Sequence, residues 1–357
     1  PGKAESGFYK GSVGTYLKTI TLTEEEMTDT MLLHFEGCFG KTRVLINGNP
    51  VGSHAYGYTP FTIDIRKFLQ IGDNEIQVIV HTDDDPNGRW YSGAGLYRGA
   101  NLLSAPAFHI AHDGIFVYTD HIKMGNVFTN GDAFCKAEIT VVNDLAKATG
   151  DAEGFLKLTV SKKDTKEVVA TRYQKIRLTA GKRQVVPQAF VIENAELWDT
   201  ENPYLYEVKA QLSLTSTGNV HMSLDNRQDL MAQTDYEDEI TTRFGVRTIT
   251  ADAKNGLLLN GKSIKLKGGC IHHDNGILGA ASFYDAEYRK VKLHKDNGYN
   301  ALRLAHNPQS EQILDICDEL GMIVFDEAFD VWNLPKNSFD FSHQFAEDGI
   351  KEIEAMV

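Results

Sequence analysis

The stretch from residue 299 to residue 332 constrains the fold most, because its apolar pattern is that of a strand, a helix and a second strand. Two strand-length apolar runs, Ala301–Leu304 and Met322–Phe325, flank an amphipathic segment that begins at Ser310 and ends at Gly321. Serine is a favoured N-cap, and glycine is favoured just past the last helical turn. Apolar residues recur in this segment at helical spacing: Ile313, Ile316, Cys317 and Leu320. The unit therefore predicts two parallel strands joined by a right-handed crossover.

Polar side chains gather just past three apolar runs in the last third of the chain. The three groups are His272, His273 and Asp274, then Arg303, His306 and Asn307, then Asp326, Glu327 and Asp330. In an α/β barrel the carboxyl ends of the strands surround one site, where the chemistry takes place. Imidazoles, carboxylates and a guanidinium suit a polyhydroxylated ligand, because each sugar hydroxyl both donates and accepts hydrogen bonds.

The region 244–357 reads as alternating strands and helices. We expect a strand at Ile264–Leu266, a helix over about 285–297 and a last helix around 343–356. Together with the central unit, this order predicts the first three βα units of a (β/α)8 TIM barrel. Adjacent strand residues point to opposite faces, so Asp326 and Glu327 are not expected to act on one bond as a catalytic pair.

The first two thirds of the chain read as β structure. Residues 1–104 predict a jelly-roll sandwich, because short alternating runs are separated by turn residues at regular intervals. Asn47-Gly48 predicts a two-residue hairpin, since a type I′ turn needs positive φ at both central positions. Residues 105–243 predict an immunoglobulin-like β-sandwich, and no cluster of histidines, cysteines or acids is found there. The chain is therefore predicted to be multidomain.

The segment 81–98, HTDDDPNGRWYSGAGLYR, is a poor strand with two adjacent aromatic residues. Trp90 and Tyr91, exposed among polar residues, could present a stacking platform to a sugar ring. The alternative is a packed aromatic loop that seals the first sandwich against its neighbour. The acidic run that begins at Asp83 is by itself more typical of a solvated loop than of a site.

Charge and cysteine usage exclude several classes of function. The net charge of −13 disfavours nucleic acid or an anionic membrane surface as the main partner. The four cysteines lie far apart, which indicates neither zinc nor a disulfide framework and favours a cytoplasmic protein. A metal site at His272 and His273 has no second spaced pair of ligands to support it. No apolar run reaches transmembrane length, so we expect no membrane partner.

The chain resembles glycoside hydrolase family 2, and within it the bacterial β-galactosidases. The matching segments are RWYSGAGLYR (89–98), RFGVRTI (243–249), LNGKSIKLKGGCIHHDNGILGAA (259–281), NALRLAHNP (300–308) and CDELGMIVFDEAFDVW (317–332). The resemblance implies a sugar-binding jelly roll, an immunoglobulin-like domain and a TIM-barrel catalytic domain. The implied activity is retaining exo-hydrolysis of terminal β-D-galactosides by a parent protein that forms homo-oligomers and uses no organic cofactor.

The resemblance also implies roles for individual residues. His272 and His306 match sugar-pocket residues, Arg303 matches the residue that orients the nucleophilic carboxylate, and Asp330 matches an acid that touches the sugar or a nearby divalent cation. The other residues expected at the substrate are Asn307, Trp332, Arg89, Trp90 and Asp83. Arg89 stands where better-known relatives carry a sugar-binding aspartate, and an arginine cannot accept hydroxyl protons.

Two catalytic glutamates are missing from the matched pattern. The family places the first in an Asn-Glu pair after the fourth barrel strand, and no such pair occurs at that place here. We therefore expect no catalytic residue in this chain, and no hydrolysis by the chain alone. Two alternatives to the β-galactosidase reading stay open: a β-glucuronidase of the same family, and a non-catalytic carbohydrate-binding or complementing subunit.

Overall fold

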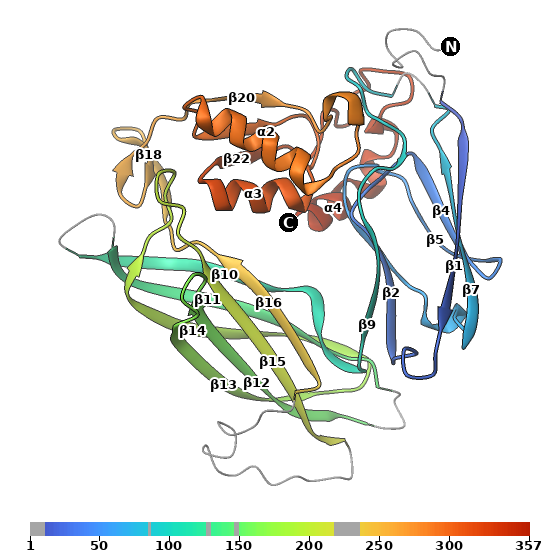
Figure 1. Ribbon diagram of the computed structural model, residues 1–357, viewed down its shortest axis with the longest axis horizontal. Coiled ribbons are helices and arrows are strands. Elements are labelled where there is room, and N and C mark those ends of the chain that lie inside the picture. The colour runs from blue at the N-terminus through green and yellow to red at the C-terminus, as the bar shows by residue number, and fades with distance from the viewer. Residues whose placement is uncertain (1–10, 85–86, 126–129, 146–149, 218–235) are drawn as a thin grey trace. The chain divides into compact units, whose positions relative to one another are not determined.

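The computed structural model describes residues 11–84, 87–125, 130–145, 150–217 and 236–357 (Figure 1). The chain divides into two compact units. The first consists of Pro1–Met27, Met31–Ser104 and Leu266–Val357, and the second consists of Thr28–Thr30 and Ala105–Lys265. The first unit therefore combines the N-terminal sandwich with the α/β segment. The domain boundaries inferred from the sequence, after residues 104 and 243, stay predictions.

The N-terminal part of the first unit is the predicted β-sandwich. Its strands are β1 (Val13–Leu22), β2 (Thr30–Phe35), β3 (Cys38–Phe39), β4 (Lys41–Ile46), β5 (Asn49–His54), β6 (Phe61–Asp64), β7 (Gly72–His81), β8 (Gly95–Leu96) and β9 (Ala100–Ala105), with a 3-10 helix η2 at Arg66–Phe68. One sheet has the order β1-β7-β4-β5, a second has the order β6-β2-β9, and β3 pairs with β8. The predicted hairpin is confirmed, since Asn47 and Gly48 have φ of 51° and 77° between β4 and β5.

The α/β segment contains a parallel sheet of order β20-β21-β22. Its elements are β20 (Gly268–Ile271), a 3-10 helix η3 (Gly276–Leu278), α2 (Tyr284–Asp296), β21 (Ala301–Leu304), α3 (Glu311–Leu320), β22 (Ile323–Asp326), a 3-10 helix η4 (Phe341–His343) and α4 (Phe345–Met356). Figure 1 shows α2 and α3 lying against this sheet, and apolar residues of both helices pack with those of the strands. The central strand–helix–strand unit is confirmed.

Local chemistry explains the helix of that unit. The Ser310 side chain accepts a hydrogen bond from the Ile313 N–H at the first turn, and Gly321 takes the left-handed conformation just past the last turn. Between these caps, Ile313, Ile316 and Cys317 are buried against the sheet. The sequence placed this helix correctly because capping residues and apolar spacing agree.

The first barrel strand was placed wrongly from the sequence. Residues Ile264–Leu266 are not a strand, and the strand is instead β20, Gly268–Ile271. The parallel pairing of Gly268 with Ala301 brings the two backbones so close that a Cβ on Gly268 would lie 2.2 Å from the Ala301 carbonyl oxygen. Glycine is required there for packing, whereas from sequence alone two adjacent glycines indicate a turn.

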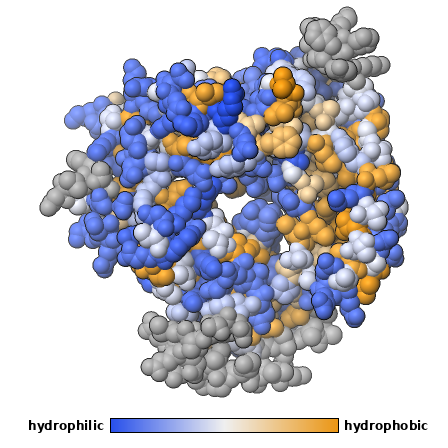
Figure 2. All heavy atoms as spheres, in the orientation of Figure 1, coloured by the Kyte–Doolittle hydropathy of each residue, from blue (hydrophilic) through white to orange (hydrophobic). Residues whose placement is uncertain are grey.

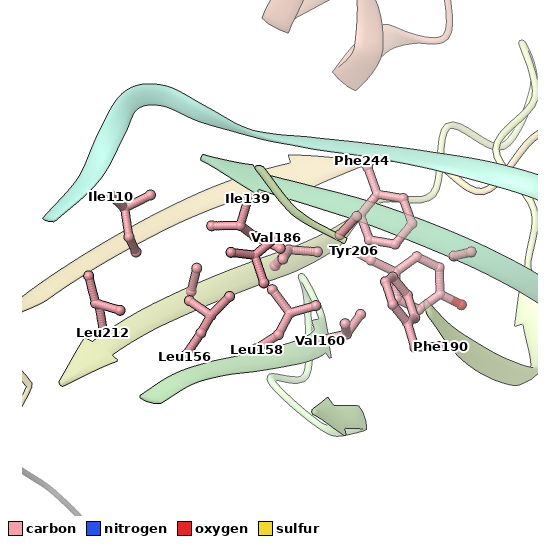
Figure 3. Close-up of a cluster of buried hydrophobic side chains, with 14 of the residues drawn as sticks. Ile110, Ile139, Leu156, Leu158, Val160, Val186, Phe190, Tyr206, Leu212 and Phe244 are labelled. Atoms are coloured by element: carbon pink, nitrogen blue, oxygen red, sulfur yellow. The ribbon is translucent and has the colours of Figure 1, made fainter. Parts of the chain in front are cut away.

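The second unit contains the predicted immunoglobulin-like sandwich. Its strands are β10 (Phe108–Met124), β11 (Asn130–Asn143), β12 (Ala152–Lys162), β13 (Val168–Leu178), β14 (Lys182–Glu196), β15 (Tyr206–Thr217) and β16 (Asp238–Phe244), followed by β17 (Ile249–Asp252), β18 (Gly256–Leu259) and β19 (Lys262–Ser263). The two main sheets have the orders β10-β11-β14 and β13-β12-β15-β16. Figure 3 shows their facing side chains, such as Ile139 and Val186 from one sheet and Leu156 and Leu158 from the other.

Apolar side chains also reach the surface of the first sandwich. Figure 2 shows them gathered over the strands of its larger sheet, and on β1 Val13 and Leu17 are 50% and 63% exposed. Within the described ranges, no helix is long and apolar enough to cross a lipid bilayer.

Candidate functional site

The parallel sheet brings three predicted site residues to one edge. Ile271 pairs with Leu304, and Leu304 pairs with Asp326, at the carboxyl ends of β20, β21 and β22. His272 and Glu327 follow their strands directly, and His306 follows β21 by two residues, after a cis peptide bond. The in-register ends therefore place two imidazoles and a carboxylate side by side.

Trp90 completes a cluster of three rings at this edge. Its indole stacks on His272 with ring centroids 5.6 Å apart, and meets His306 edge-on at 5.4 Å. His272 and His306 are themselves 5.6 Å apart. Among the described residues, nothing hydrogen-bonds the buried Trp90 Nε1 or the buried His272 Nδ1. Three ring systems from two separate segments of the chain thus share one location.

Glu327 connects two of the predicted residues. One of its carboxylate oxygens accepts a hydrogen bond from Arg303 Nε, and the other lies 2.7 Å from His306 Nδ1. Arg303 also donates to the Cys270 sulfur at 3.4 Å, and the hydrogen bonds to Cys270 and Glu327 raise the pKa of the Arg303 guanidinium. The arginine therefore stays cationic and is held from both sides.

Asp330 binds two cationic side chains, those of Arg89 and Lys336. Arg89 donates to both of its carboxylate oxygens, and Lys336 Nζ lies 3.0 Å from Oδ1 and 2.6 Å from the Asp330 carbonyl oxygen. Burial acts to raise the Asp330 pKa, but the hydrogen bonds from Arg89 and Lys336 outweigh it and leave the pKa lowered. Asp330 is therefore a carboxylate over the whole neutral range.

These residues surround an open cleft with a volume of about 460 Å³. That volume lies within the range of about 300–1,000 Å³ that is usual for small-molecule sites. The cleft is lined by Arg89, Arg303, His306, Glu327, Ala328, Phe329, Asp330, Trp332, Lys336, Phe345 and Ile353. A neighbouring aromatic cavity shares His306, Phe329 and Asp330 with the cleft and is further lined by Trp90 and by side chains of the sandwich.

Residues of the sandwich hold its loop against the strand ends. Tyr56 donates through its hydroxyl to the Ala328 carbonyl at 2.6 Å, Arg98 donates to the Pro308 carbonyl at 2.8 Å, and His273 Nε2 lies 3.0 Å from the Ser92 carbonyl. A buried cluster of Phe39, Tyr56, Tyr58, Tyr97 and Ala280 fills the space beneath. Tyr97 belongs to this packed cluster, as the alternative interpretation of the segment 81–98 expects, and Trp90 packs against the cluster and lines the aromatic cavity. The role of Trp90 as a stacking platform for a sugar stays a prediction.

Asp326 and Glu327 have different surroundings. Burial raises the pKa of Asp326 to about 7, and its Oδ1 has no hydrogen-bond partner within the described part of the chain. Glu327, by contrast, binds Arg303 and His306 at the cleft. Neighbouring His273 is also buried, which lowers its pKa to about 4, so its ring is neutral and structural. Asp326 and His273 are therefore separated from the cleft.

Not every predicted residue lines the cleft. Asn307 is fully buried and donates to the Pro308 carbonyl at 3.1 Å. Asp83 lies on the exposed loop, 3.8 Å from His81, while its neighbour Asp84 lines the aromatic cavity; Asp85 is outside the described residues. Trp332 does line the cleft, where it is 66% exposed and stacks on Phe345.

Two residues that contribute to the site could not be identified from the sequence. Lys336, which binds Asp330, lies in an irregular segment without a recognisable motif. Tyr56 has the sequence pattern of an ordinary core residue of the sandwich, and only the structure shows that its hydroxyl donates to the Ala328 carbonyl. Glu327 was grouped with the other strand-end residues from the sequence, but it was not expected to bind the substrate. Among the described residues, no group of three or more His, Cys, Asp or Glu side chains is arranged to hold a metal ion.

Family models match almost the whole chain, in the order of the three structural regions. The sugar-binding domain of glycosyl hydrolases family 2 matches residues 6–106, the model named for the family itself matches residues 120–247, and the family's TIM barrel domain matches residues 251–348. The chain belongs to glycosyl hydrolase family 2. These matches confirm the predicted order of domains: a sugar-binding β domain, an immunoglobulin-like domain and the start of a TIM barrel.

Similar family 2 proteins carry two kinds of name. A β-galactosidase of Bacteroides ovatus, BoGH2A, is 32% identical over 97% of this chain and 38% of its own length. A putative β-glucuronidase of Formosa agariphila is 31% identical over 92% of this chain and 28% of its own length. The solved structure of a family 2 member from Bacteroides cellulosilyticus matches with a TM-score of 0.87 and 34% sequence identity. The match covers 99% of this chain and 42% of that protein. This chain thus spans about two fifths or less of the length of these relatives.

Proposed function

We propose that this family 2 chain supplies substrate-binding residues of a retaining exo-glycosidase that acts on terminal β-D-galactosides. The observation that carries the proposal is the convergence of Trp90, His272 and His306, whose ring centroids all lie within 5.6 Å of one another. An aromatic face beside hydrogen-bonding groups suits a sugar ring, which has apolar faces and a polar rim. The cleft next to these rings supplies that rim through Glu327, Asp330 and Arg303.

The charge pattern of the cleft favours a neutral sugar. Its three cations each have an acidic partner, because Arg303 binds Glu327, while Arg89 and Lys336 bind Asp330. A carboxylate on the ligand would have to compete with Asp330 for the two outer cations. The hydroxyls of galactose impose no such competition, since they can bond to carboxylates that keep their cations.

A β-glucuronide is the second candidate. The side chains of Arg89 and Lys336 are 50% and 43% exposed, so both can turn toward an anionic group in the cleft. Carboxylate recognition usually relies on such cations. The names of the similar proteins support both substrate classes.

We further propose that the catalytic acid/base and nucleophile lie outside this chain. A retaining glycosidase needs two carboxyl groups about 5–5.5 Å apart on either side of the scissile bond. Asp326 is half-buried and its pKa is raised to about 7, and Glu327 and Asp330 are each occupied by two cationic or imidazole partners. None of them has the free carboxylate face that a nucleophile requires.

Activity of two preparations tests the proposal. The first preparation is the protein encoded by the complete gene, called here the protein encoded by the uninterrupted gene. It is expected to hydrolyse nitrophenyl β-D-galactoside with a higher kcat/KM than nitrophenyl β-D-glucuronide. The second preparation is the 357-residue chain, which is expected to hydrolyse neither substrate. Higher kcat/KM on the glucuronide would select the second candidate. Turnover by the 357-residue chain that is lost on changing a residue within it would contradict the placement of the catalytic carboxylates. A gene without an Asn-Glu segment downstream would favour a non-catalytic complementing subunit.

A further inference from the structure

Glu327 stands at a position where its side chain is firmly placed. Its N–H donates to the Leu304 carbonyl at 3.3 Å, which extends the parallel pairing of β21 and β22 by one residue. The carboxylate is only 24% exposed and has one partner for each oxygen, Arg303 on Oε1 and His306 on Oε2. Such a carboxylate acts on two neighbours at once, and its effect on the imidazole is chemically specific.

We propose that Glu327 is a positioning residue that holds neutral His306 in the tautomer with the proton on Nδ1. A carboxylate oxygen only accepts hydrogen bonds, and it lies 2.7 Å from that nitrogen, so Nδ1 must carry the proton. Whenever the ring is neutral, the other ring nitrogen, Nε2, then has a lone pair and acts as an acceptor. Glu327 thereby decides what kind of group His306 can recognise.

The surroundings of His306 direct this acceptor to a ligand. The side chain is 25% exposed, and His306 lines both the cleft and the aromatic cavity. Its ring packs edge-on against Trp90 and His272, and no described residue hydrogen-bonds Nε2. An unprotonated nitrogen recognises an O–H or N–H donor, and a sugar hydroxyl is such a donor. Only this last identification rests on the proposed function; the tautomer does not.

Arg303 strengthens the arrangement without determining the tautomer. Its Nε occupies the Glu327 oxygen that His306 does not use, and its Nη1 is anchored separately on the Cys270 sulfur at 3.4 Å. Removal of the Cys270 anchor should leave the contact between Glu327 and His306 intact. Cys270 therefore provides a matched control on the opposite side of the same arginine.

Nitrogen-detected NMR of the 357-residue chain, labelled with 15N at histidine, tests the proposal at a pH where the ring is neutral. Two histidines serve as internal references, because a carbonyl can only accept. His294 Nδ1 lies 2.8 Å from the Lys290 carbonyl and must be protonated there, whereas His273 Nε2 lies 3.0 Å from the Ser92 carbonyl and must be protonated at that nitrogen. The His306 signals, identified by their loss in His306→Gln, are expected to match the pattern of His294. A pattern like that of His273 would overturn the proposal in the unaltered chain.

The variant Glu327→Gln gives a sharper outcome. The amide oxygen is needed by Arg303, so the amide N–H faces His306 Nδ1 and the proton is expected to move to Nε2. His306 should then change to the pattern of His273, while Cys270→Ala should leave it unchanged. An unchanged His306 tautomer in a folded Glu327→Gln chain would show that the carboxylate has only a structural role.

The same variants separate this inference from the proposed function. In the protein encoded by the uninterrupted gene, Glu327→Gln is expected to lower kcat/KM for the galactoside by about tenfold or more, since Nε2 becomes a donor. Inversion of the tautomer in a protein without any glycosidase activity would uphold the inference and contradict the proposed function. Full activity on the galactoside despite the inverted tautomer would overturn the role of Nε2 as acceptor.

Discussion

The indole of Trp90 and the imidazole of His272 lie nearly parallel, with ring centroids 5.6 Å apart and an interplanar angle of 17°. Trp90 belongs to the loop of the N-terminal sandwich, and His272 follows the first parallel strand. Aromatic contacts of this kind contribute about 0.5–1.5 kcal/mol beyond the area that they bury. The stack therefore holds the loop against the strand ends, and the proposed ligand site requires both segments.

Replacement of Trp90 by alanine is predicted to weaken the binding of β-galactosides by about tenfold, because the stacking surface is lost and His272 and His306 lose their common neighbour. KM of the protein encoded by the uninterrupted gene, or isothermal titration with a galactoside inhibitor, measures the effect. Phe116→Ala is the control, since Phe116 is 59% exposed on β10 of the other compact unit. Equal affinity of the Trp90→Ala and unaltered proteins would remove the ring cluster from the binding site.

The substitution Asp330→Asn is predicted to shift substrate preference toward glucuronides. Asparagine keeps the shape of the side chain but leaves Arg89 and Lys336 without a carboxylate, so an anionic substrate gains two available cations. The ratio of kcat/KM for glucuronide over galactoside should rise by about tenfold. Asp120→Asn removes an equal charge from the exposed pair with Lys136 in the other compact unit and should leave that ratio unchanged. A ratio that falls in Asp330→Asn would mean that Asp330 itself contacts the distinguishing group of the substrate.

A buried carboxyl lies where α4 contacts the sandwich. Glu352 is 6% exposed and accepts a hydrogen bond from the Thr59 hydroxyl, and His54 Nε2 lies 3.6 Å from the same oxygen. Burial raises the pKa of Glu352 to about 7 and lowers the pKa of His54 to about 4. The two side chains are therefore mostly uncharged near pH 6, and each resists ionisation in the folded state.

The variant Glu352→Gln is predicted to gain stability relative to the unaltered chain as the pH rises. The folded-state pKa of Glu352, about 7, lies above the ordinary value of 4.5, so folding favours the protonated form and stability falls as the pH rises from about 4.5 through 7. The amide avoids this loss, which reaches about 3 kcal/mol at alkaline pH. The lowered pKa of His54 decreases the stability of both proteins below pH 6.5, so the comparison is made against a measurement at pH 8.5, where His54 is neutral in both the folded and the unfolded chain.

Urea denaturation at pH 5 and pH 8.5 measures this difference. The free energy of unfolding of Glu352→Gln minus that of the unaltered chain should be larger at pH 8.5. Lys292→Gln is the control, because Lys292 is exposed and pairs with Asp296 on α2, a different helix. A difference that is the same at both pH values would show that Glu352 ionises normally in the folded chain.

The immunoglobulin-like core offers a matched pair on one strand. Val186 on β14 is fully buried between the two sheets, while its neighbour Val185 is 50% exposed (Figure 3). Val186→Ala is predicted to lower the free energy of unfolding by about 2 kcal/mol, since two buried methyl groups are lost. Val185→Ala should change it by less than about 0.5 kcal/mol. Equal effects from both substitutions, measured by thermal denaturation, would contradict the register of β14.

Much of the fold follows from local signals in the sequence. Ser310 and Gly321 cap α3, and Asn47-Gly48 forms the β4–β5 hairpin, because these residues satisfy backbone requirements that few others meet. The first parallel strand could not be placed in this way. Gly268 belongs to β20 because the neighbouring backbone approaches closely, and such an approach exists only once the sheet has formed.

The site was predictable to the extent that it depends on strand ends. His272, His306 and Arg303 could be grouped because parallel strands bring their carboxyl ends together. The approach of Lys336 to Asp330 could not, since it depends on the path of an irregular segment. Asn307 was wrongly expected to bind the substrate, because it follows a strand end but is fully buried.

The central claim is that Trp90 and the strand-end histidines form one sugar site, and ligand titration followed by NMR tests it most directly. Addition of methyl β-D-galactoside to the 357-residue chain should shift the indole signal of Trp90 and the imidazole signals of His272 and His306 together, with one common binding curve. His294 on α2 and His121 on β10 should not respond. Separate binding curves for Trp90 and the two histidines, or no shift at saturating sugar, would contradict the claim.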